Sequence, residues 1–556
     1  MRSTHRITAL LIVFALLISL SGCGASSKQP ERSSPLGIYT VYKDGEVIVE
    51  HVNFDHYQEP EDNARVFYEI FVGSFSDSDG DGIGDLRGII DRMDYLNDGE
   101  PASGRSLGVE GIWLTPIFSS RSYHKYDVND YYEIDPEFGT MEDLKDLIEI
   151  CHERDVKLIL DLVINHTGRA NPWFQSFVAA HRQDDKEDPY YDYYSYIRSG
   201  DPVPAGHNYS QLSGTDIYFE CNFDAAMPEL NFEDADVRRA VLDVAKFYLD
   251  MGVDGFRFDA SKYLFLGETD RNVEFWDWYI KELKKIKPDV YAVAEVWDGD
   301  GITDKYFEAL NCFNFTVSGA NGLIADVAKA GDANRLTSYV EGYLSKVRGI
   351  RQDSMIVPFI SNHDMDRAAG YLTTASYNMQ FAANLYILGP GSPFIYYGEE
   401  LGMRGSRGGS NTDANRRLAM LWGDDDTVSD PEGSDYSQDN QLKEGVSVQI
   451  ARDDSLLTYY KKLIMIRKAN PEIARGVYKA LKLSNTKAGG FISTWNGSSV
   501  CVLHNPSINP QTIDLSAVKG AENFTILRDS IGEGSASIED SMLTIDGHTS
   551  VVLRTE

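Results

Sequence analysis

Arg257 and Asp259 lie two residues apart in the segment Gly255-Phe-Arg-Phe-Asp259. The apolar run 253–258 predicts a buried strand, which points alternate side chains to the same side. A neighbouring guanidinium keeps a carboxyl group ionised. An ionised carboxylate at the carboxyl end of a barrel strand could act as a nucleophile. The alternative is a buried ion pair that only fixes a loop.

Two more acidic residues, Glu295 and Asp364, follow predicted strands. Strand ends on one face of a parallel barrel converge on one cavity, so we expect the three carboxylates to meet. Three close carboxylates cannot all stay ionised, and one of them should have a raised pKa. Because Arg257 favours ionised Asp259, Glu295 is the better candidate for the protonated acid. An acid and a nucleophile are what retaining glycoside cleavage needs.

The elements that must position these residues begin near residue 65, where short apolar strands alternate with helical stretches. This alternation predicts a (β/α)₈ TIM barrel, an α/β fold. A barrel unit takes roughly 30 residues, yet 98 residues separate Asp161 from Asp259. The excess predicts a small domain inserted after strand three. The predicted strands are 66–72, 109–115, 157–163, 253–259, 290–296, 312–316, 355–361 and 393–397.

The remaining segments complete the predicted domain organisation. Residues after 470 are rich in β-forming segments and turns, which predicts a C-terminal antiparallel β-sandwich. Residues 40–52 alternate around Lys43-Asp-Gly-Glu46, which predicts a hairpin turn there. The predicted divisions are a lipoprotein signal peptide (1–22), a tether with a short hairpin (23–60), the catalytic barrel (61–166 and 233–470), the inserted domain (167–232) and the sandwich (471–556).

The N-terminus has the pattern of a secretion signal, because Arg2, His5 and Arg6 precede the apolar run 9–20. This run is too short to remain as a membrane span. It ends in Leu20-Ser-Gly-Cys23, which resembles the bacterial lipobox. The resemblance implies cleavage before Cys23 and lipidation of its thiol, so we expect an exported protein, lipid-anchored to the bacterial cell membrane and facing outside. The alternative is an ordinary signal peptide.

Composition restricts the class of partner. The chain has 556 residues with 52 Lys and Arg against 86 Asp and Glu, a net charge of −34. This charge argues against nucleic acid and against an anionic membrane surface, and it suits a soluble monomer with a neutral substrate. The other cysteines match no metal motif, and buried free thiols are favoured over disulfides. They are Cys151, Cys221, Cys312 and Cys501.

Four segments together resemble the four barrel motifs of the α-amylase family of glycoside hydrolases. They are Asp161-Leu-Val-Ile-Asn165-His166, Gly255-Phe-Arg257-Phe-Asp259, Glu295-Val-Trp and Asn362-His363-Asp364. The resemblance implies that Asp259 is the nucleophile and Glu295 the general acid/base. It implies that Asp364 is a third carboxylate, which binds sugar hydroxyls and helps to distort the ring.

The same resemblance implies substrate-binding residues around this centre. Arg257 would hold the nucleophile, and His166 and His363 would hydrogen-bond the sugar. Asp161 resembles the family's structural aspartate at the end of strand three.

A loop after strand two, Tyr123-His124-Lys125-Tyr126-Asp127, is similar to the family's Tyr-His-Gly-Tyr loop. This similarity implies that His124 and Tyr126 bind substrate, with Tyr126 stacking on the sugar. Lys125 stands where the family usually has Gly, which leaves the path of the loop open.

Two segments bear on bond specificity. Met227-Pro-Glu-Leu-Asn231 resembles neopullulanase-related and intermediate members, and Ala260-Ser-Lys262 after the nucleophile resembles members that cleave α-1,4 bonds. The resemblance places Lys262 near the leaving sugar, with a surface lysine as the alternative.

The segment 77–85 alternates carboxylates with glycines, a pattern that wraps oxygen ligands around a hard cation. Gly88 stands at the twelfth position, so this is not an EF-hand. The segment resembles the metal loop of oligo-1,6-glucosidase-like members, which implies Ca²⁺, with Mg²⁺ as the alternative ion and a solvated acidic turn as the alternative interpretation. The implied ligands are the side chains of Asp77, Asp79, Asp81 and Asp85 and the carbonyl of Ile83.

The family's second calcium site is not expected in this chain, because Tyr263 stands where that site has a histidine. No organic cofactor is expected.

The expected function is that of an α-amylase, a retaining glycoside hydrolase that cleaves internal α-1,4-glucosidic bonds of starch or maltodextrins at the cell surface. The alternatives within this chemistry are a neopullulanase or maltogenic amylase, an oligo-α-glucosidase and a glucosyltransferase. A non-enzymatic alternative is a glycan-binding lipoprotein on the same scaffold, which would be expected to have lost a carboxylate.

Overall fold

The computed structural model describes residues 38–43, 46–329, 331–372, 377–410, 412–423, 425–484 and 486–555. The predicted signal peptide and Cys23 lie outside these residues. Among the residues described, no helix has the length and apolar character to cross a membrane. The four other cysteines are buried and free, which confirms the expectation of thiols rather than disulfides.

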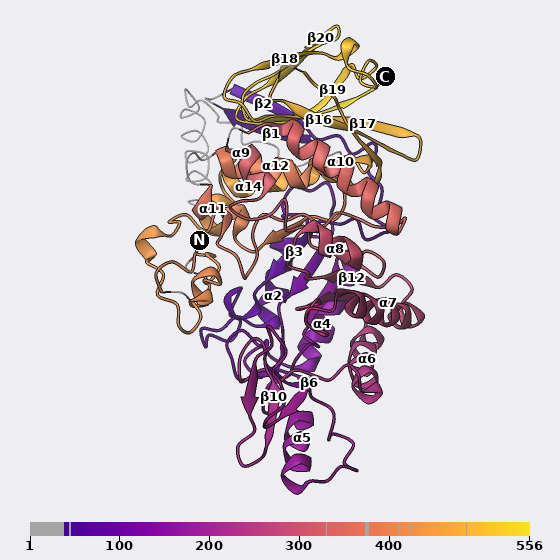
Figure 1. Ribbon diagram of the computed structural model, residues 1–556. Helices are drawn as coiled ribbons and strands as arrows, with labels where there is room; N and C mark the ends of the chain where they lie inside the picture. Colours follow the sequence, from indigo (N-terminus) through magenta and orange to yellow (C-terminus); the bar gives the residue numbers. More distant parts are fainter. Residues whose placement is uncertain are drawn as a thin grey trace, which may run out of the picture.

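The centre of the fold is a parallel sheet of seven strands in the order β13-β12-β11-β7-β4-β3-β14 (Figure 1). All neighbouring strands in this order are parallel, as the alternation of strands and helices predicts. The strands are β3 (Phe67–Ile70), β4 (Gly111–Leu114), β7 (Lys157–Leu162), β11 (Gly255–Phe258), β12 (Tyr291–Ala294), β13 (Asn311–Cys312) and β14 (Phe394–Tyr396).

The predicted seventh strand, 355–361, closes the ring between β13 and β14. Val357 forms an isolated parallel bridge with Phe313, and the amide of Phe394 donates to the carbonyl of Pro358 at 2.9 Å. Pro358 has no N–H group, so it cannot extend a regular ladder. The closed barrel confirms the predicted fold class, although this segment is not a regular strand.

Large side chains pack in the barrel interior. Phe67, Trp113, Tyr291 and Phe394 are buried there in one apolar cluster. A Cβ on Gly111 would lie 2.4 Å from the Phe67 ring, so glycine is needed where this ring packs.

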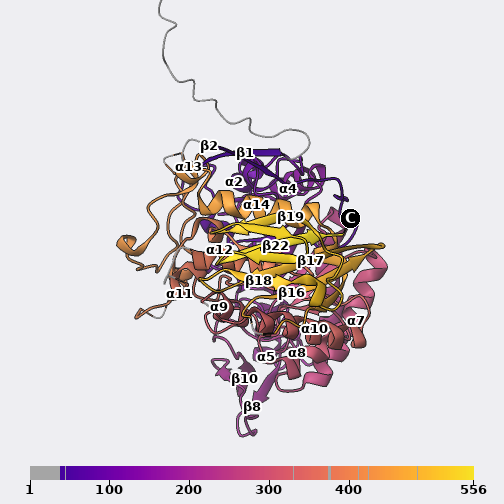
Figure 2. The same ribbon diagram turned by 90° about the horizontal axis from the view of Figure 1, so that it is seen from above.

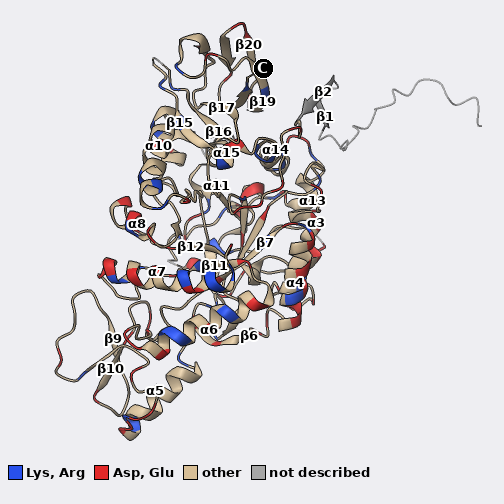
Figure 3. Cartoon of the chain, turned by 90° about the vertical axis from the view of Figure 1, so that its right-hand side faces the viewer, with Lys and Arg blue, Asp and Glu red and all other residues tan. Residues whose placement is uncertain are grey.

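Amphipathic helices surround the sheet (Figure 3). Helix α4 (Met141–Glu153) begins with a capping box between Thr140 and Asp143, and its buried face includes Leu144, Leu147 and Ile148. Helices α2 (Leu86–Asp91) and α3 (Met93–Leu96) meet at Arg92. The other helices around the barrel are α6 (Ala235–Met251), α7 (Thr269–Ile286), α8 (Asp300–Tyr306), α9 (Leu323–Ala328), α10 (Ala333–Ile350), α11 (Ala368–Tyr371), α12 (Tyr377–Ile387) and α14 (Leu456–Ala469).

Between β7 and α6 the chain forms the predicted insertion. It contains α5 (Pro172–Gln183) and an antiparallel sheet in the order β8-β10-β9. Figure 1 shows α5 and β10 at the end of the molecule away from the C-terminal strands. The strands are β8 (Tyr196–Arg198), β9 (Tyr209–Gln211) and β10 (Ile217–Glu220).

The C-terminal part consists of two antiparallel sheets, in the orders β15-β16-β17-β22-β19 and β18-β21-β20. Cys501, Leu503 and Leu543 belong to one buried cluster to which both sheets contribute, which is the packing of a sandwich (Figure 2). The strands are β15 (Val477–Ala480), β16 (Gly489–Trp495), β17 (Ser498–Asn505), β18 (Gln511–Asp514), β19 (Ile526–Gly532), β20 (Ala536–Glu539), β21 (Met542–Ile545) and β22 (Thr549–Arg554).

The predicted N-terminal hairpin is also present. β1 (Ile38–Lys43) pairs with β2 (Glu46–His51) in antiparallel register, with Lys43 opposite Glu46.

Candidate active site

A cavity of about 800 Å³ opens at the carboxyl ends of the barrel strands. Asp259 directly follows β11, Glu295 directly follows β12, and Asp364 follows the segment that closes the barrel. All three predicted carboxylates line this cavity, so the structure brings them together as the strand pattern predicts. The other lining residues from the sequence prediction are His124, Tyr126, His166 and Lys262.

Arg257 connects the acidic residues. Its guanidinium is 1% exposed, and Nη1 lies 2.6 Å from Asp259 Oδ1 and 2.8 Å from Asp161 Oδ1. Nη2 lies 3.1 Å from Glu295 Oε2. One buried cation therefore contacts both the predicted nucleophile and the predicted acid. Neighbouring carboxylates, Asp161 foremost, hold the pKa of Arg257 well above its usual value although burial opposes this, so the guanidinium stays charged.

Glu295 has the environment of a proton-bearing carboxyl group. Burial raises its pKa, and the nearby negative charges of Asp259 and Asp364 raise it further, whereas Arg257 opposes the shift. Its Oε2 accepts a hydrogen bond from the amide of Ala260 at 3.0 Å. Ala260 has φ +45°, in the left-handed region, where a non-glycine residue is strained. The turn after β11 therefore orients Glu295 as well as Asp259.

The pKa of Asp364 is shifted in the opposite direction from that of Glu295. Burial alone would raise its pKa, but two cations outweigh that effect and hold its pKa far below the usual range. His363 Nε2 lies 3.0 Å from Asp364 Oδ2, and Arg417 Nη2 lies 2.8 Å from Oδ1. The site thus separates a carboxylate that stays ionised from a carboxyl group that can keep a proton.

A buried chain of hydrogen bonds joins Glu69 of β3 to Asp161. Glu69 Oε1 lies 2.6 Å from His363 Nδ1, and the Tyr126 hydroxyl lies 2.7 Å from His363 Nε2 and donates to Asp161 at 2.9 Å. Burial alone would lower the pKa of His363, but Asp364 and Glu69 raise it to about 10. His363 is therefore an imidazolium that donates from both ring nitrogens, so the Tyr126 hydroxyl accepts from it.

The other two histidines are neutral. Burial, with a contribution from Arg417, lowers the pKa of His124 to about 4, and burial lowers the pKa of His166. The amide of Tyr126 donates to His124 Nδ1 at 3.1 Å, so the proton of His124 is on Nε2. His166 Nε2 is buried and has no partner among the described atoms. Both rings line the cavity and can hydrogen-bond a polar ligand there.

Aromatic rings border the cavity. Tyr126 stacks on His363, with ring centroids 5.5 Å apart. Trp297 is 44% exposed and stacks on Phe315 at 5.0 Å, which supports an open ring face beside Glu295. Lys262 Nζ donates to the Trp297 carbonyl at 2.7 Å and pairs with Asp298 at 3.0 Å. Lys262 therefore fixes the backbone that carries Trp297 while it lines the cavity.

The loop that carries Tyr126 makes its turn with a lysine at the position where the family usually has glycine. Lys125 has φ +64°, the left-handed conformation in which glycine is unstrained. Its side chain is buried, and its Nζ pairs with Asp135 at 3.1 Å and Glu137 at 2.6 Å. These ion pairs explain how a lysine occupies this position.

Sequence reasoning missed two charged residues of the site, Glu69 and Arg417. Glu69 is 1% exposed within β3, and a single acid in a buried strand was the available signal. Arg417 follows a short 3₁₀ helix, η3 (Asp413–Arg416), and also donates to the Tyr123 hydroxyl at 3.0 Å. No spacing pattern connects such a loop residue to Asp364.

The predicted metal loop lies between β3 and α2. One carboxylate oxygen from each of Asp77, Asp79 and Asp85 lies within 4.8 Å of the others, a donor set that suits a hard cation. Asp81 is not in this group, and its Oδ1 accepts from the amide of Ile83 at 2.7 Å. The loop therefore assembles three of the four predicted carboxylates.

Contacts from a distant segment hold the same loop. Asp77 Oδ2 accepts from the Thr427 hydroxyl at 2.6 Å, and Ser429 donates to the carbonyl of Gly82 at 2.7 Å. Asp85 also caps α2 by accepting from the amide of Gly88 at 2.7 Å.

Comparisons with known proteins agree with this geometry. The family model described as "Alpha amylase, catalytic domain" matches residues 69–476. Alpha-amylase 3 of Dictyoglomus thermophilum is 35% identical over 83% of this chain and 88% of its own. A 4-alpha-glucanotransferase of Thermotoga neapolitana is 30% identical over 79% of this chain and 95% of its own. An oligo-1,6-glucosidase of Parageobacillus thermoglucosidasius is 29% identical over 79% and 89%.

Solved structures give the same result. Eubacterium rectale Amy13B superposes with a TM-score of 0.82 at 33% identity and covers 90% of this chain and 97% of its own. An alpha-amylase from H. orenii superposes with a TM-score of 0.76 at 34% identity and covers 89% and 100%.

Proposed function

Because this chain belongs to the α-amylase family of glycoside hydrolases, we propose that it is a retaining enzyme that cleaves internal α-1,4-glucosidic bonds of starch or maltodextrins. The observation that carries the proposal is the contact of one buried guanidinium, Arg257, with both Asp259 and Glu295. The raised pKa of Glu295 supports its role as the acid, and the contact with Arg257 supports Asp259 as the nucleophile.

The proposed reaction has two steps. Glu295 gives its proton to the glycosidic oxygen while Asp259 attacks the anomeric carbon, so the bond to the leaving sugar breaks and a glycosyl ester forms. Glu295, now a carboxylate, takes a proton from water, whose oxygen attacks the anomeric carbon and releases Asp259. Asp364 accepts hydrogen bonds from sugar hydroxyls, and His124 and His166 bind other hydroxyls. His363, expected from the sequence to bind the sugar, is fully buried with both ring nitrogens engaged, so it holds Tyr126 and Asp364 in place instead.

The proposal also covers which glucosidic bond is cleaved and whether water or another sugar receives the glycosyl group. Lys262 and the exposed face of Trp297 lie beside Glu295, where the leaving sugar must sit, which supports binding of a glucan chain on that side. Relatives include proteins named alpha-amylase, 4-alpha-glucanotransferase and oligo-1,6-glucosidase. The alternatives are therefore a neopullulanase or maltogenic amylase, an oligo-α-glucosidase and a glucosyltransferase.

A product profile tests the proposal. The purified chain is incubated with starch, pullulan and maltotriose beside Glu295→Gln, and NMR follows the anomeric form of fresh products. We expect a ladder of α-configured maltodextrins from starch and none from the variant. Panose from pullulan would indicate a neopullulanase, and glucose from maltotriose alone would indicate a glucosidase. Longer products from maltotriose would indicate a transferase. Initial β-products would contradict retention, and no products would favour a glycan-binding protein.

We propose further that Asp77, Asp79 and Asp85 hold Ca²⁺. Three clustered carboxylates favour Ca²⁺ over Mg²⁺, which prefers to keep several waters. The ion would stabilise the loop that joins β3 to α2 at the mouth of the barrel.

The lipobox-like Leu20-Ser-Gly-Cys23 supports a lipid-anchored protein on the outer side of the bacterial membrane. Phase partition of the chain expressed in a bacterium tests this. The protein should enter the detergent phase, and Cys23→Ser should stay in the aqueous phase. Partition of both forms into the aqueous phase would contradict the anchor.

A further inference from the structure

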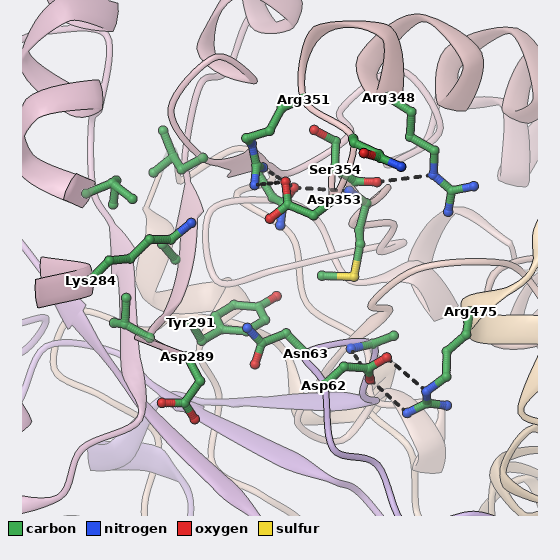
Figure 4. A pocket seen from close by; sticks show the side chains of 18 of the residues that line it. Asp62, Asn63, Lys284, Asp289, Tyr291, Arg348, Arg351, Asp353, Ser354 and Arg475 are labelled. Atoms are coloured by element: carbon green, nitrogen blue, oxygen red, sulfur yellow. Dashed lines mark hydrogen bonds and ion pairs between the residues drawn. The ribbon is translucent and has the colours of Figure 1, made fainter. Parts of the chain in front are cut away.

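A second cavity, of about 560 Å³, lies at the end of the barrel opposite the carboxylates. Its wall includes Tyr291 and Asn311, which begin β12 and β13, so it opens at the amino ends of the strands. Helices α7 and α10 supply Lys284 and Arg348 to it (Figure 4). Strand β16 supplies Trp495. The size is typical of a site for a small molecule.

Each carboxylate in this wall already has a cation of its own. Asp62 takes two hydrogen bonds from Arg475, at 3.0 and 2.9 Å. Asp353 lies 2.8 Å from Arg351, and Asp289 lies 3.3 Å from Lys157. The acids are therefore neutralised without any contribution from Lys284 or Arg348.

Lys284 and Arg348 remain as surplus positive charge. Within the described part of the chain, no carboxylate lies within ion-pair distance of either, and only Arg348 Nε makes a bond, a long one of 3.4 Å to the carbonyl of Ser354. Burial lowers the pKa of Arg348, and no nearby acid opposes that shift. A half-buried guanidinium without an acid is costly, and it is unusual in a chain with a net charge of −34.

Two buried polar atoms in the same wall also lack partners. Ser354 is 1% exposed, and its hydroxyl has no hydrogen bond among the described atoms. Asn63 Oδ1 is buried without a partner as well. Because most buried polar atoms in proteins are hydrogen-bonded, these two leave the polar groups behind the wall incompletely satisfied.

Part of the wall is apolar. Trp495 is partly exposed, Val477 is 72% exposed, and Ile280 and Met355 complete this side. A bare ion would leave most of the volume and these surfaces uncovered, whereas an organic group would cover them.

We propose that this cavity binds a small organic phosphate monoester. Such a ligand supplies the negative charge that Lys284 and Arg348 lack, and its oxygens can accept from a guanidinium fork or an ammonium group. Its organic part contacts Trp495. The site lies at the other end of the barrel from the proposed hydrolytic centre and does not depend on that function.

Ligand-induced stabilisation tests the site on the full chain. Thermal unfolding is followed while phenyl phosphate or inorganic phosphate is added, with ionic strength held constant by sodium chloride. We expect Tm to rise with phenyl phosphate in a saturable way, because the folded state alone binds it. Arg348→Gln should weaken the apparent affinity at least tenfold, and Lys284→Gln should weaken it in the same direction.

Matched variants on the same helices control for the loss of charge. Lys281→Gln in α7 and Arg335→Gln in α10 remove cations that are paired with Asp277 and Asp326. Both should leave the affinity unchanged. If Arg348→Gln does not fold, Lys284→Gln carries the test, because its side chain is exposed.

The outcomes separate the possible sources of phosphate. A response to inorganic phosphate that equals the response to phenyl phosphate would assign the site to the free ion and remove the organic part of the proposal. No response to either ligand beyond that to chloride would overturn the proposal, as would an equal loss of affinity in the two control variants.

Discussion

Glu69 Oε1 lies 2.6 Å from Nδ1 of His363, and both side chains are fully buried. The contact joins the first strand of the barrel to the loop that carries Asp364. It also fixes the charge of His363, whose pKa is raised to about 10 by Asp364 and Glu69 against the effect of burial. Glu69 therefore acts on the site without lining its cavity.

Glu69→Gln should lower the pKa of His363, because it removes one of the two negative charges beside the ring. The imidazolium that faces Asp364 is then lost at lower pH, so the difference in kcat/KM between the native chain and the variant should widen as pH rises. We expect kcat to fall about tenfold, the equivalent of one hydrogen bond to a charged group, about 1.5 kcal/mol. Glu133→Gln, on the exposed face of β6 (Val128–Ile134), is the control.

Stability gives a second measure of the same pair. A raised folded-state pKa stabilises the fold fully below the unfolded value of 6.5, and this contribution is lost as pH rises through about 10. The difference in unfolding free energy between the native chain and Glu69→Gln should therefore be larger at pH 6 than at pH 10. An equal difference at both values would contradict a charged His363.

Asp259→Asn and Glu295→Gln should respond differently to the leaving group. A dinitrophenyl α-glycoside needs no protonation on departure, so Glu295→Gln should form the glycosyl ester at nearly the native rate. On maltodextrins the activity of the same variant should fall by about 10²–10⁴-fold, which is the usual contribution of a general acid. Asp259→Asn should lose activity on both substrates. If Asp259→Asn instead kept its activity on the dinitrophenyl glycoside, Asp259 would be the acid and Glu295 the nucleophile.

Asp364→Asn should move the alkaline limb of the remaining activity to lower pH. Glu295 must carry a proton to act as the acid, so activity falls as pH rises through its pKa. Asp364 is one of the negative neighbours that raise this pKa, and its removal lowers it. Asp277→Asn, on the outer surface of α7, is the control. If the alkaline limb of Asp364→Asn lay at the same pH as that of the native chain, a group other than Glu295 would set it.

Removal of the metal should destabilise the loop 77–85. In Ca²⁺ the native chain should unfold several degrees higher than in a chelator, because the folded carboxylate cluster alone binds the ion. Asp79→Asn should abolish most of this difference, whereas Asp91→Asn, at the end of α2, should preserve it. Equal melting temperatures with and without Ca²⁺ would argue for a solvated acidic turn, and an equal response to Mg²⁺ would argue against selectivity.

The chemistry of the site was predictable because strand ends are marked in the sequence. Asp259, Glu295 and Asp364 each follow a short apolar run, and a parallel barrel brings such positions to one face. The same rule predicted the closed barrel. It did not predict that the segment 355–361 contributes only a bridge, although Pro358 explains this once the neighbouring strands are known.

Other parts of the site depend on contacts between distant residues. The pairing of Glu69 with His363 spans 294 residues, and that of Arg417 with Tyr123 spans 294 as well. No local pattern encodes such pairs, because they follow from how the loops pack over the barrel. The position of Asp81 outside the carboxylate cluster is a local effect instead, since its oxygen accepts from the amide of Ile83, two residues later.

Closure of the barrel also determines which contacts can form only late in folding. The Ser392 hydroxyl donates to the carbonyl of Arg65, 327 residues earlier, beside the pairing of β14 with β3. Contacts of such long separation form late, after the intervening chain has been made. A chain that ends before Tyr396 would keep an unpaired edge on β3, open to pairing with other chains. Synthesis of the barrel is therefore vulnerable to aggregation until its last strand is available.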